Sequence, residues 1–493
     1  MRRYLNYIDG QFVEPVEGGW LDSYDPFRGE PWAQVPRSGQ QDVELAVGAA
    51  ARAFAGADLQ RLNATERGRL LHHLADVVAA NVDRLLETEI RDNGKLRQDM
   101  IGQLTYLPDH FRYHAGMADK LEGSTIPVDK ADMFNFTVYE PLGVVAAITP
   151  WNSPLVVAAT KLAPALAAGN CVVLKPSEHA AVSTMVLAEL IDQAGFPRGM
   201  INVISGLGAE AGAALAGHPQ VDKVAFTGGE TGGRSVYQAG AGTFKKLVLE
   251  LGGKSPNVVF DDANLDDAIS GAITGIFAAA GQSCIAGSRL LLQEGIHDAF
   301  VERLVAMGRT VRMGDPADDA TQIGPIATRP QYERILDYVG IARDGGATCV
   351  LGGSAAARPE CGAGWFIEPT IFTGVTNDMR IAREEVFGPV LSVLKFRDEE
   401  DAVRIANDVD FGLAAGVWTQ NLGRALRMSR RIRAGTVWVN NYRTMSCMTP
   451  FGGFKKSGLG RLNGKTAILE YVQQKSVWVN IGTDPAPNPF VMR

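Results

Sequence analysis

The chain is poor in cysteine: it has five cysteines among 493 residues, and no two of them form a CxxC pair. A small, odd number of scattered cysteines argues against a disulfide framework and provides no ligand set for a structural zinc ion. We therefore expect no metal site. Such sparse cysteine usage is typical of proteins from a reducing compartment, and the expected location is cytoplasmic.

Long apolar runs and a basic excess are also missing. No stretch approaches the roughly 18 consecutive apolar residues of a membrane span, and residues 1–6 lack the apolar core of a signal peptide. The 48 lysines and arginines stand against 55 aspartates and glutamates, for a net charge of −7. A nucleic-acid-binding face needs a basic patch. Neither a membrane nor a nucleic acid is therefore expected as a partner.

What is present is the composition of an ordinary globular protein, 46% hydrophobic and 21% charged, over a length that predicts at least two domains. The N-terminal region is expected to contain a hairpin at residues 7–12 and amphipathic helices at 42–55 and 66–92. Asn63 and Glu66 resemble a capping box at the start of the second helix, and Gly94 is expected to end it.

Short β-branched runs alternate with helical stretches from residue 136 to residue 260. This alternation predicts βαβ units and a doubly wound parallel sheet, whose ligands bind beyond the carboxyl ends of the strands. A second alternation indicates a separate α/β domain. The predicted strands are 144–148, 171–174, 201–204, 223–226, 247–249 and 257–260 in the first region, and 289–293, 390–396 and 436–440 in the second.

Two segments that follow predicted strands can bind a nucleotide. Lys175-Pro176-Ser177-Glu178 follows the second strand, and the glycine-rich segment 227–234 follows the fourth. Glycines let the backbone approach a phosphate, and the next helix N-terminus favours negative charge. Lys175 can donate to ribose or phosphate oxygens, whereas Glu178 can accept from ribose hydroxyls and would repel a 2′-phosphate, which favours NAD over NADP. The alternative interpretation is a glycine-rich turn and a solvated surface pair.

Gly206-Leu207-Gly208-Ala209-Glu210-Ala211 matches the G-x-G-x-x-G/A dinucleotide fingerprint. The acidic residue that the fingerprint expects about 20 residues later is absent. We therefore interpret the segment as helix packing near the adenine end of the cofactor, not as the pyrophosphate cradle.

Gly281-Gln282-Ser283-Cys284 ends an apolar, alanine-rich run that begins at Ala268. A cysteine at such a helix-to-loop turn can act as a nucleophile when its surroundings favour the thiolate. Most free cysteines are instead small buried hydrophobic residues. The segment alone leaves both interpretations open.

A set of motifs in fixed order resembles the NAD(P)-dependent aldehyde dehydrogenase superfamily, in its non-phosphorylating, CoA-independent form. The resemblance extends from about residue 7 to residue 475. The motifs are Pro150–Pro154, Lys175–Glu178, Phe226–Gly228, Leu249–Lys254, Gly281–Cys284, Glu385–Pro389 and Pro450–Gly453.

The resemblance implies two Rossmann-like doubly wound domains and a small β arm for oligomerisation. The NAD-binding domain would comprise 1–122 and 142–250, with 457–475 returning to it, and the catalytic domain 251–456. The arm would comprise 123–141 and 476–493 and would join subunits into a dimer or tetramer.

The resemblance also implies roles for individual residues. Cys284 would attack the aldehyde, Asn152 would help form the oxyanion hole, and Glu250 would activate water to hydrolyse a thioester. Lys161 would help Glu250 to lose its proton. The implied cofactor-binding residues are Ile148, Thr149, Trp151, Asn152, Lys175, Ser177, Glu178, Gly208, Thr227, Gly228, Gly229, Gly233, Leu251, Gly252, Glu385 and Phe387.

The sequence departs from the family pattern in three places. Gly229 stands where many relatives have a serine that contacts the pyrophosphate, and Gln473 stands where several have a glutamate that relays protons. The third departure is in the pocket, where Ser153, Val157 and Thr160 replace larger side chains of several relatives. This difference predicts a roomy aldehyde tunnel.

The substrate and the acyl acceptor remain open at this stage. Arg443, before the Pro450–Gly453 motif, could bind the carboxylate of a semialdehyde, or it could be a surface arginine paired with an acid or another subunit. Tyr442, Met445 and Met448 would suit an apolar aldehyde equally well. A CoA-acylating enzyme is one alternative function, although Glu250 argues for water. A non-catalytic binding or structural protein on the same fold is the other.

Overall fold

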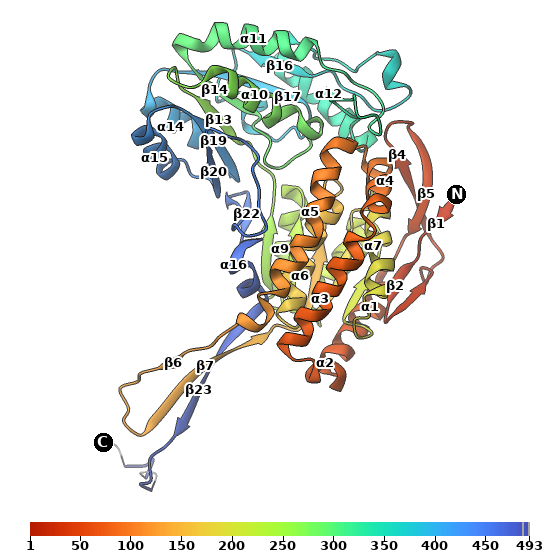
Figure 1. The fold of residues 1–493 in the computed structure, drawn as a ribbon, viewed down its shortest axis with the longest axis vertical. Coiled ribbons are helices and arrows are strands. Elements are labelled where there is room, and N and C mark those ends of the chain that lie inside the picture. The colour runs from red at the N-terminus through yellow and green to blue at the C-terminus, as the bar shows by residue number, and fades with distance from the viewer. Residues whose placement is uncertain (486–487, 492–493) are drawn as a thin grey trace.

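The computed structural model describes residues 1–485 and 488–491 of the chain. Two sheets covered by helices form the body, and a long β arm projects from it (Figure 1). Residues 486–487 and 492–493, which belong to the predicted arm, lie outside the described residues.

The first sheet has eight strands in the order β22-β12-β11-β8-β9-β10-β2-β3. Its five central strands run parallel and are almost entirely buried, which explains their apolar sequences. Antiparallel strands close both edges, including the predicted hairpin. The strands are β2 (Asn6–Ile8), β3 (Gln11–Val13), β8 (Val144–Ile148), β9 (Cys171–Lys175), β10 (Ile201–Val203), β11 (Lys223–Thr227), β12 (Lys246–Glu250) and β22 (Gly458–Leu459).

Helices cover this sheet, and α5 packs on both α3 and α6. The helices are α1 (Gln40–Ala55), α2 (Ala57–Arg61), α3 (Ala64–Ala79), α4 (Val82–Asn93), α5 (Arg97–Ala115), α6 (Pro154–Ala167), α7 (Val182–Gln193), α8 (Ala213–Gly217) and α9 (Glu230–Ala241). A small sheet of β1 (Arg2–Arg3), β5 (Glu30–Pro36) and β4 (Trp20–Asp25) lies near the N-terminus.

The prediction of one helix over 66–92 is wrong, because two helices, α3 and α4, occupy this region. The chain leaves the helical conformation at Asn81, whose φ and ψ are −120° and 17°. The Asn81 side chain donates to the Val77 carbonyl at 2.8 Å, which is the local competition with helical hydrogen bonds that asparagine provides. The predicted ends are confirmed: Asn63 and Glu66 form the capping box, and Gly94 has φ +71°.

The second sheet has seven strands in the order β15-β16-β17-β14-β13-β19-β20, and only the edge strand β15 is antiparallel. It confirms the predicted second alternation. Its strands are β13 (Pro256–Val259), β14 (Arg289–Gln293), β15 (Thr348–Leu351), β16 (Thr370–Thr373), β17 (Val390–Phe396), β19 (Ala414–Trp418) and β20 (Thr436–Val439). Its helices are α10 (Leu265–Phe277), α11 (His297–Arg309), α12 (Arg329–Asp344), α13 (Arg380–Arg383), α14 (Glu399–Asn407) and α15 (Leu422–Arg431).

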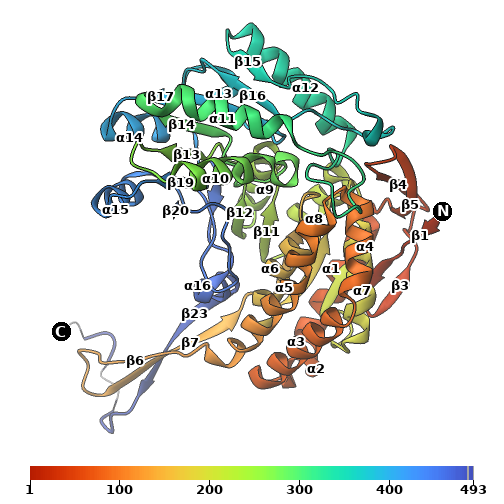
Figure 2. The ribbon, with the colours of Figure 1, turned by 45° about the horizontal axis from the view of Figure 1, so that its top comes forward.

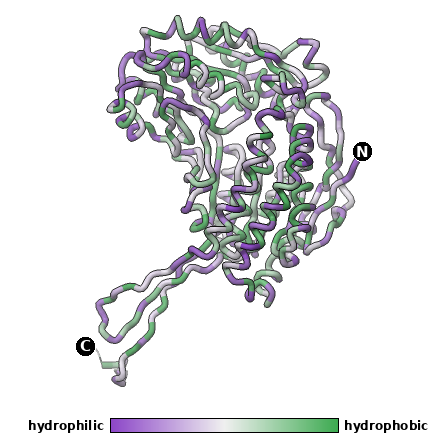
Figure 3. The backbone as a smooth tube through the Cα atoms, in the orientation of Figure 1, coloured by the Kyte–Doolittle hydropathy of each residue, from purple (hydrophilic) through white to green (hydrophobic). Residues whose placement is uncertain are grey.

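The arm consists of β6 (Thr125–Ile126), β7 (Met133–Pro141) and β23 (Val472–Asn480). β23 pairs with β7 along its whole length, so segments more than 300 residues apart in sequence lie side by side. The arm projects from the body in both ribbon views (Figures 1 and 2), and hydrophobic and hydrophilic residues are mixed along it (Figure 3). Phe134, Trp478 and Val479 are exposed on it.

After β20 the chain passes to the arm through β21 (Phe454–Lys455), β22 and α16 (Gly464–Ala467), and β21 pairs with β18 (Phe411–Gly412), which precedes β19. β22 pairs with β12 and thereby joins the end of the chain to the first sheet. Over residues 1–485 and 488–491, no helix combines the length and the apolar character needed to cross a bilayer.

Candidate active site

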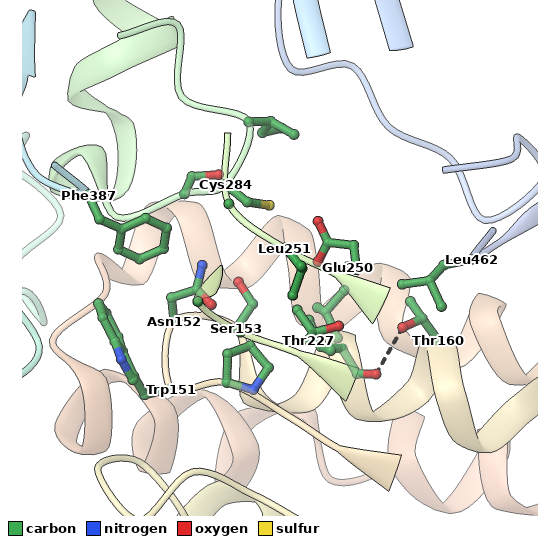
Figure 4. Close-up of a pocket in the computed structure, with 18 of the residues that line it drawn as sticks. Trp151, Asn152, Ser153, Thr160, Thr227, Glu250, Leu251, Cys284, Phe387 and Leu462 are labelled. Atoms are coloured by element: carbon green, nitrogen blue, oxygen red, sulfur yellow. Dashed lines mark hydrogen bonds between the residues drawn. The ribbon is translucent and has the colours of Figure 1, made fainter. Parts of the chain in front are cut away.

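A cavity of about 300 Å³ is lined by residues from both sheets. Asn152 follows β8, Thr227 ends β11 and Glu250 ends β12, as expected for the carboxyl ends of parallel strands. Cys284 and Phe387 reach the same cavity from the second sheet. Figure 4 shows these side chains around one space.

The loop that carries Cys284 has an unusual backbone. After α10 ends at Phe277, Ala279, Ala280 and Gly281 all have positive φ, with values of 53°, 50° and 71°. A Cβ on Gly281 would lie 2.0 Å from the carbonyl oxygen of Gly388, so glycine is required there by both conformation and space. The loop is therefore strained locally and held by close packing.

The Gln282 side chain anchors this loop. Its Nε2 donates to the carbonyls of Ala279 and Pro325, both at 3.3 Å, and its Oε1 accepts from the Ala327 amide at 2.8 Å. Tyr442 supports the other end, since its hydroxyl donates to the Ile285 carbonyl at 3.1 Å. Tyr442 thus lies beneath the loop and not in the aldehyde path.

The Cys284 thiol points toward the Glu250 carboxyl (Figure 4). Burial raises the pKa of the thiol well above its ordinary value, and the charges of Glu250 and Glu385 raise it further. Arg443 acts in the opposite direction and lowers the pKa. Formation of the thiolate therefore needs a proton acceptor close by.

Asn152 is placed to stabilise an oxyanion beside Cys284. Its Nδ2 donates to the Gln282 carbonyl at 3.0 Å. An amide nitrogen has two hydrogens, so the second is left to donate to an oxygen in the cavity. The hydrogen bond orients the amide before any ligand arrives.

Glu250 and Lys161 are both buried near Thr227 and affect each other's pKa. Thr227 and Glu250 are register partners in β11 and β12, and Lys161 Nζ on α6 donates to Thr227 Oγ1 at 2.7 Å. Burial raises the pKa of Glu250, and Lys161 opposes this rise. Burial correspondingly lowers the pKa of Lys161. Glu250 Oε1 has no hydrogen-bond partner among the described residues, so it is available to a water molecule or a proton.

Aromatic and acidic side chains line the side of the cavity away from Glu250. Trp151 and Phe387 meet edge to face with ring centroids 5.3 Å apart (Figure 4). Glu385 Oε1 accepts from the Gly253 amide at 2.9 Å, and a Cβ on Gly252 would lie 2.3 Å from Glu385 Oε2. Burial raises the pKa of Glu385 to about 7.

Lys175 and Glu178 interact with each other and with the backbone. Lys175 Nζ lies 3.7 Å from Glu178 Oε2 and donates to the Pro176 carbonyl at 2.9 Å. Glu178 Oε1 accepts from the Gly208 amide at 3.1 Å. Burial opposes ionisation of Glu178, but Lys175 and the backbone amides hold its pKa below the ordinary value. Glu178 is thus an ionised acceptor next to Gly208.

The start of α9 offers an open helix N-terminus. Gly229 is the N-cap residue, and no side chain caps this helix. A Cβ on Gly229 would meet no atom within 4 Å, whereas a Cβ on Gly228 would lie 2.6 Å from the Phe226 ring and one on Gly233 2.5 Å from Leu251. The backbone amides at this helix end can donate hydrogen bonds to an anion in the space beside Gly229.

The structure brings most of the predicted site residues to one cavity. Its lining includes Trp151, Asn152, Thr227, Gly228, Gly229, Glu250, Leu251, Gly252, Cys284, Glu385 and Phe387. The other predicted residues lie outside this lining: Ile148, Thr149, Lys161, Lys175, Ser177, Glu178, Gly208 and Gly233. Thr160 and Val157 also line the cavity, as does Ser153.

Sequence reasoning missed several lining residues. Gln331 and Arg334 on α12 reach the cavity, and Gln331 Nε2 donates to the carbonyls of Val386 and Phe387. Neither belongs to a recognisable motif, so no local signal was available. Gln473, by contrast, lies exposed on β23 opposite Glu140 in the arm and outside the cavity lining.

The comparisons with known proteins agree with this arrangement. The model of the aldehyde dehydrogenase family matches residues 12–477. The chain is 46% identical over 495 residues to the (Z)-2-((N-methylformamido)methylene)-5-hydroxybutyrolactone dehydrogenase of Acinetobacter baylyi, covering 100% of both chains. It is 45% identical to an aldehyde dehydrogenase of Emericella nidulans, covering 97% of this chain and 95% of the relative.

The fold is equally close to solved structures. A betaine aldehyde dehydrogenase from Staphylococcus aureus in complex with NAD+ superposes with a TM-score of 0.97 at 37% identity, covering 99% of this chain and 97% of that one. The chain belongs to the aldehyde dehydrogenase family. It is an enzyme of that class, with the family's fold over almost its whole length.

Proposed function

We propose that the enzyme oxidises an aldehyde to its carboxylic acid with NAD, through a thiohemiacetal and a thioester on Cys284. The observation that carries the proposal is the meeting of Cys284, Asn152 and Glu250 in one cavity. Together they supply a nucleophile, an oxyanion donor and a base, which is the complete set that acyl chemistry requires.

The first half of the reaction follows from the thiol and the amide. Cys284 loses its proton to a base in the cavity, and its sulfur attacks the aldehyde carbon to form a thiohemiacetal. The Asn152 amide donates its second hydrogen to the resulting oxyanion. A donor of this kind typically accounts for about 10²–10³ in rate.

The residues around the cavity fit a dinucleotide. The open N-terminus of α9 beside Gly229 suits a pyrophosphate, and Glu178 offers carboxylate oxygens to ribose hydroxyls. Phe387 and Glu385 lie close to Cys284, where the nicotinamide end would be held. These residues would hold NAD, which when bound would supply the acceptor for the hydride of the thiohemiacetal carbon. The solved betaine aldehyde dehydrogenase with NAD+ supports this choice of cofactor.

Hydrolysis of the thioester needs a base for water. Glu250 Oε1 has no hydrogen-bond partner among the described residues, and the carboxyl faces the Cys284 side chain and has a raised pKa, so it can take a proton from water near neutral pH. Lys161, which is hydrogen-bonded to Thr227, lowers the pKa of Glu250 against the effect of burial. This set favours water over coenzyme A as acceptor, and it argues against a protein that only binds.

The domain organisation is proposed as predicted, with the NAD-binding domain formed by 1–122, 142–250 and the returning segment 457–475, and the catalytic domain by 251–456. We propose that the arm joins subunits, because Phe134, Trp478 and Val479 expose apolar area and β23 is an edge strand of the arm sheet. A dimer or a tetramer would cover them.

The experiment is NADH formation by the purified protein over a panel of aldehydes, compared with Cys284→Ala. We expect the variant to lose activity and to keep its affinity for NAD, measured by calorimetry. Cys349→Ala is the matched control, because Cys349 lies on β15 at the edge of the second sheet and outside the cavity. Turnover by Cys284→Ala at the wild-type rate would contradict the mechanism.

A further inference from the structure

A second cavity, of about 640 Å³, adjoins the first, and the Cys284 loop forms part of the wall of both. Ser283 and Ile285, which flank the nucleophile, line both cavities, as do Ser153 and Met445. A substrate whose aldehyde carbon is at Cys284 therefore has room to extend past Met445 into this second space.

Two cations line the second cavity, and neither Asp nor Glu is among its described lining residues. One cation is Arg443, whose Nη1 donates to the Ala278 carbonyl at 3.2 Å. The other is Lys95, between α4 and α5, whose Nζ donates to Ser153 Oγ at 2.7 Å and to Gln103 Oε1 at 3.5 Å. Both cations are thus partnered by neutral oxygens.

These two cations form no salt bridge among the described residues, and the acids that act on them, Glu89 on Lys95 and Asp99 on Arg443, only partly offset the effect of burial on their pKa. Lys95 is 8% exposed and Arg443 half-buried, and burial lowers the pKa of each. The acid that most affects Lys95 is Glu89, itself fully buried, with a pKa raised to about 7. A partly protonated Glu89 compensates the ammonium incompletely. A carboxylate placed between Lys95 and Arg443 would gain charge-assisted hydrogen bonds from both.

The backbone of Arg443 points to the same conclusion. Its φ is +68°, a left-handed conformation that is unfavourable for a residue with a long side chain. Strain of this kind persists where the surroundings over-determine a side chain, and it is concentrated at ligand sites. In this conformation the guanidinium donates to the Ala278 carbonyl at the cavity wall and forms no salt bridge among the described residues.

We propose that the second cavity binds a carboxylate at the far end of the substrate, so that the enzyme oxidises a semialdehyde of a dicarboxylic acid. Lys95 and Arg443 hold the carboxylate while the aldehyde carbon meets Cys284. The proposal rests on the aldehyde oxidation argued above. It decides between the two interpretations of Arg443 and adds Lys95, which sequence reasoning missed.

The test compares ω-oxo acids of four to six carbons with their methyl esters, measured as kcat/KM for NADH formation. For wild type we expect the best acid to exceed its ester by at least about tenfold, as charge-assisted hydrogen bonds imply. In Arg443→Gln the acid-to-ester ratio should fall toward one, mainly through KM. Arg112→Gln, which removes an exposed cation of α5, is the matched control and should keep the wild-type ratio.

The second measurement is the alkylation rate of Cys284, which does not depend on turnover. It can therefore be made on Lys95→Met even if that variant has little activity. Glutarate should slow alkylation of Cys284 by iodoacetamide in wild type and do so several-fold less in Arg443→Gln or Lys95→Met. Equal protection by dimethyl glutarate would overturn the proposal. The proposal would also be overturned if Arg443→Gln kept the wild-type acid-to-ester ratio and raised the pKa of Cys284 alkylation. The guanidinium would then stabilise the thiolate and not a substrate carboxylate.

The outcomes also separate this proposal from the underlying function. Absence of NADH with every aldehyde would contradict aldehyde oxidation itself. NADH formation with acids and esters at equal kcat/KM would leave the oxidation intact and overturn the carboxylate site alone.

Discussion

Lys161 Nζ and Thr227 Oγ1 are joined by a 2.7 Å hydrogen bond, which places a buried ammonium directly behind the strand position opposite Glu250. The lysine lies outside the cavity lining, but its charge lowers the pKa of Glu250 against the effect of burial. The pKa of Glu250, the base of the proposed hydrolysis, therefore depends on Lys161, a residue that does not line the cavity.

The first prediction concerns this pair and pH. Because Glu250 must be ionised to accept a proton from water and burial raises its pKa to about 7, thioester hydrolysis should become faster as the pH rises through about 7. Lys161→Met removes the charge that lowers this pKa, so the midpoint should move upward by on the order of one pH unit. Single-turnover hydrolysis at several pH values measures it. Lys161→Arg should restore the midpoint, and an unmoved midpoint in Lys161→Met would contradict the coupling.

The second prediction separates the two half-reactions. Glu250→Gln keeps the shape of the side chain but removes the base, so NADH should appear in a burst close to one per active subunit, followed by slow turnover. Rapid-mixing absorbance measures the burst, and Glu302→Gln on the exposed face of α11 is a control without effect. Loss of the burst itself would show that Glu250 also takes the proton of Cys284, which lies in front of it.

The third prediction uses the open space at Gly229. A Cβ fits there without contact, so Gly229→Ser should fold normally, cap α9 and add a hydroxyl beside the proposed pyrophosphate site. We expect KM for NAD to fall several-fold and the melting temperature to rise slightly. Gly229→Ala adds the Cβ without the hydroxyl and should not lower KM. Equal KM values in the two variants would contradict the phosphate contact.

The fourth prediction concerns the choice between NAD and NADP. Glu178 is held ionised by Lys175 and the Gly208 amide, so its charge should repel a 2′-phosphate. Glu178→Gln should raise kcat/KM for NADP relative to NAD by about tenfold, since one charge repulsion is removed. Glu210→Gln, two residues beyond Gly208 and exposed, is the matched control. A similar gain in both variants would assign the effect to overall charge.

Sequence patterns predicted the strands well because buried parallel strands are short apolar runs, and the candidate residues follow them at Asn152, Thr227 and Glu250. The break at Asn81 was missed because the apolar spacing continues across it, while a single side-chain hydrogen bond ends the helix. Lys95 was missed for another reason. Its partner Ser153 is 58 residues away, and no local pattern shows that a lysine after a helix end is buried.

The raised pKa of Cys284 has a consequence for oxidative damage. Peroxide converts a thiolate, and not a thiol, to sulfenic acid, and further oxidation is irreversible. Burial and the nearby carboxylates raise the pKa of this thiol and so disfavour its thiolate form. Peroxide should therefore inactivate the enzyme slowly when no ligand is bound. Inactivation should be faster only while a bound substrate or cofactor promotes loss of the Cys284 proton.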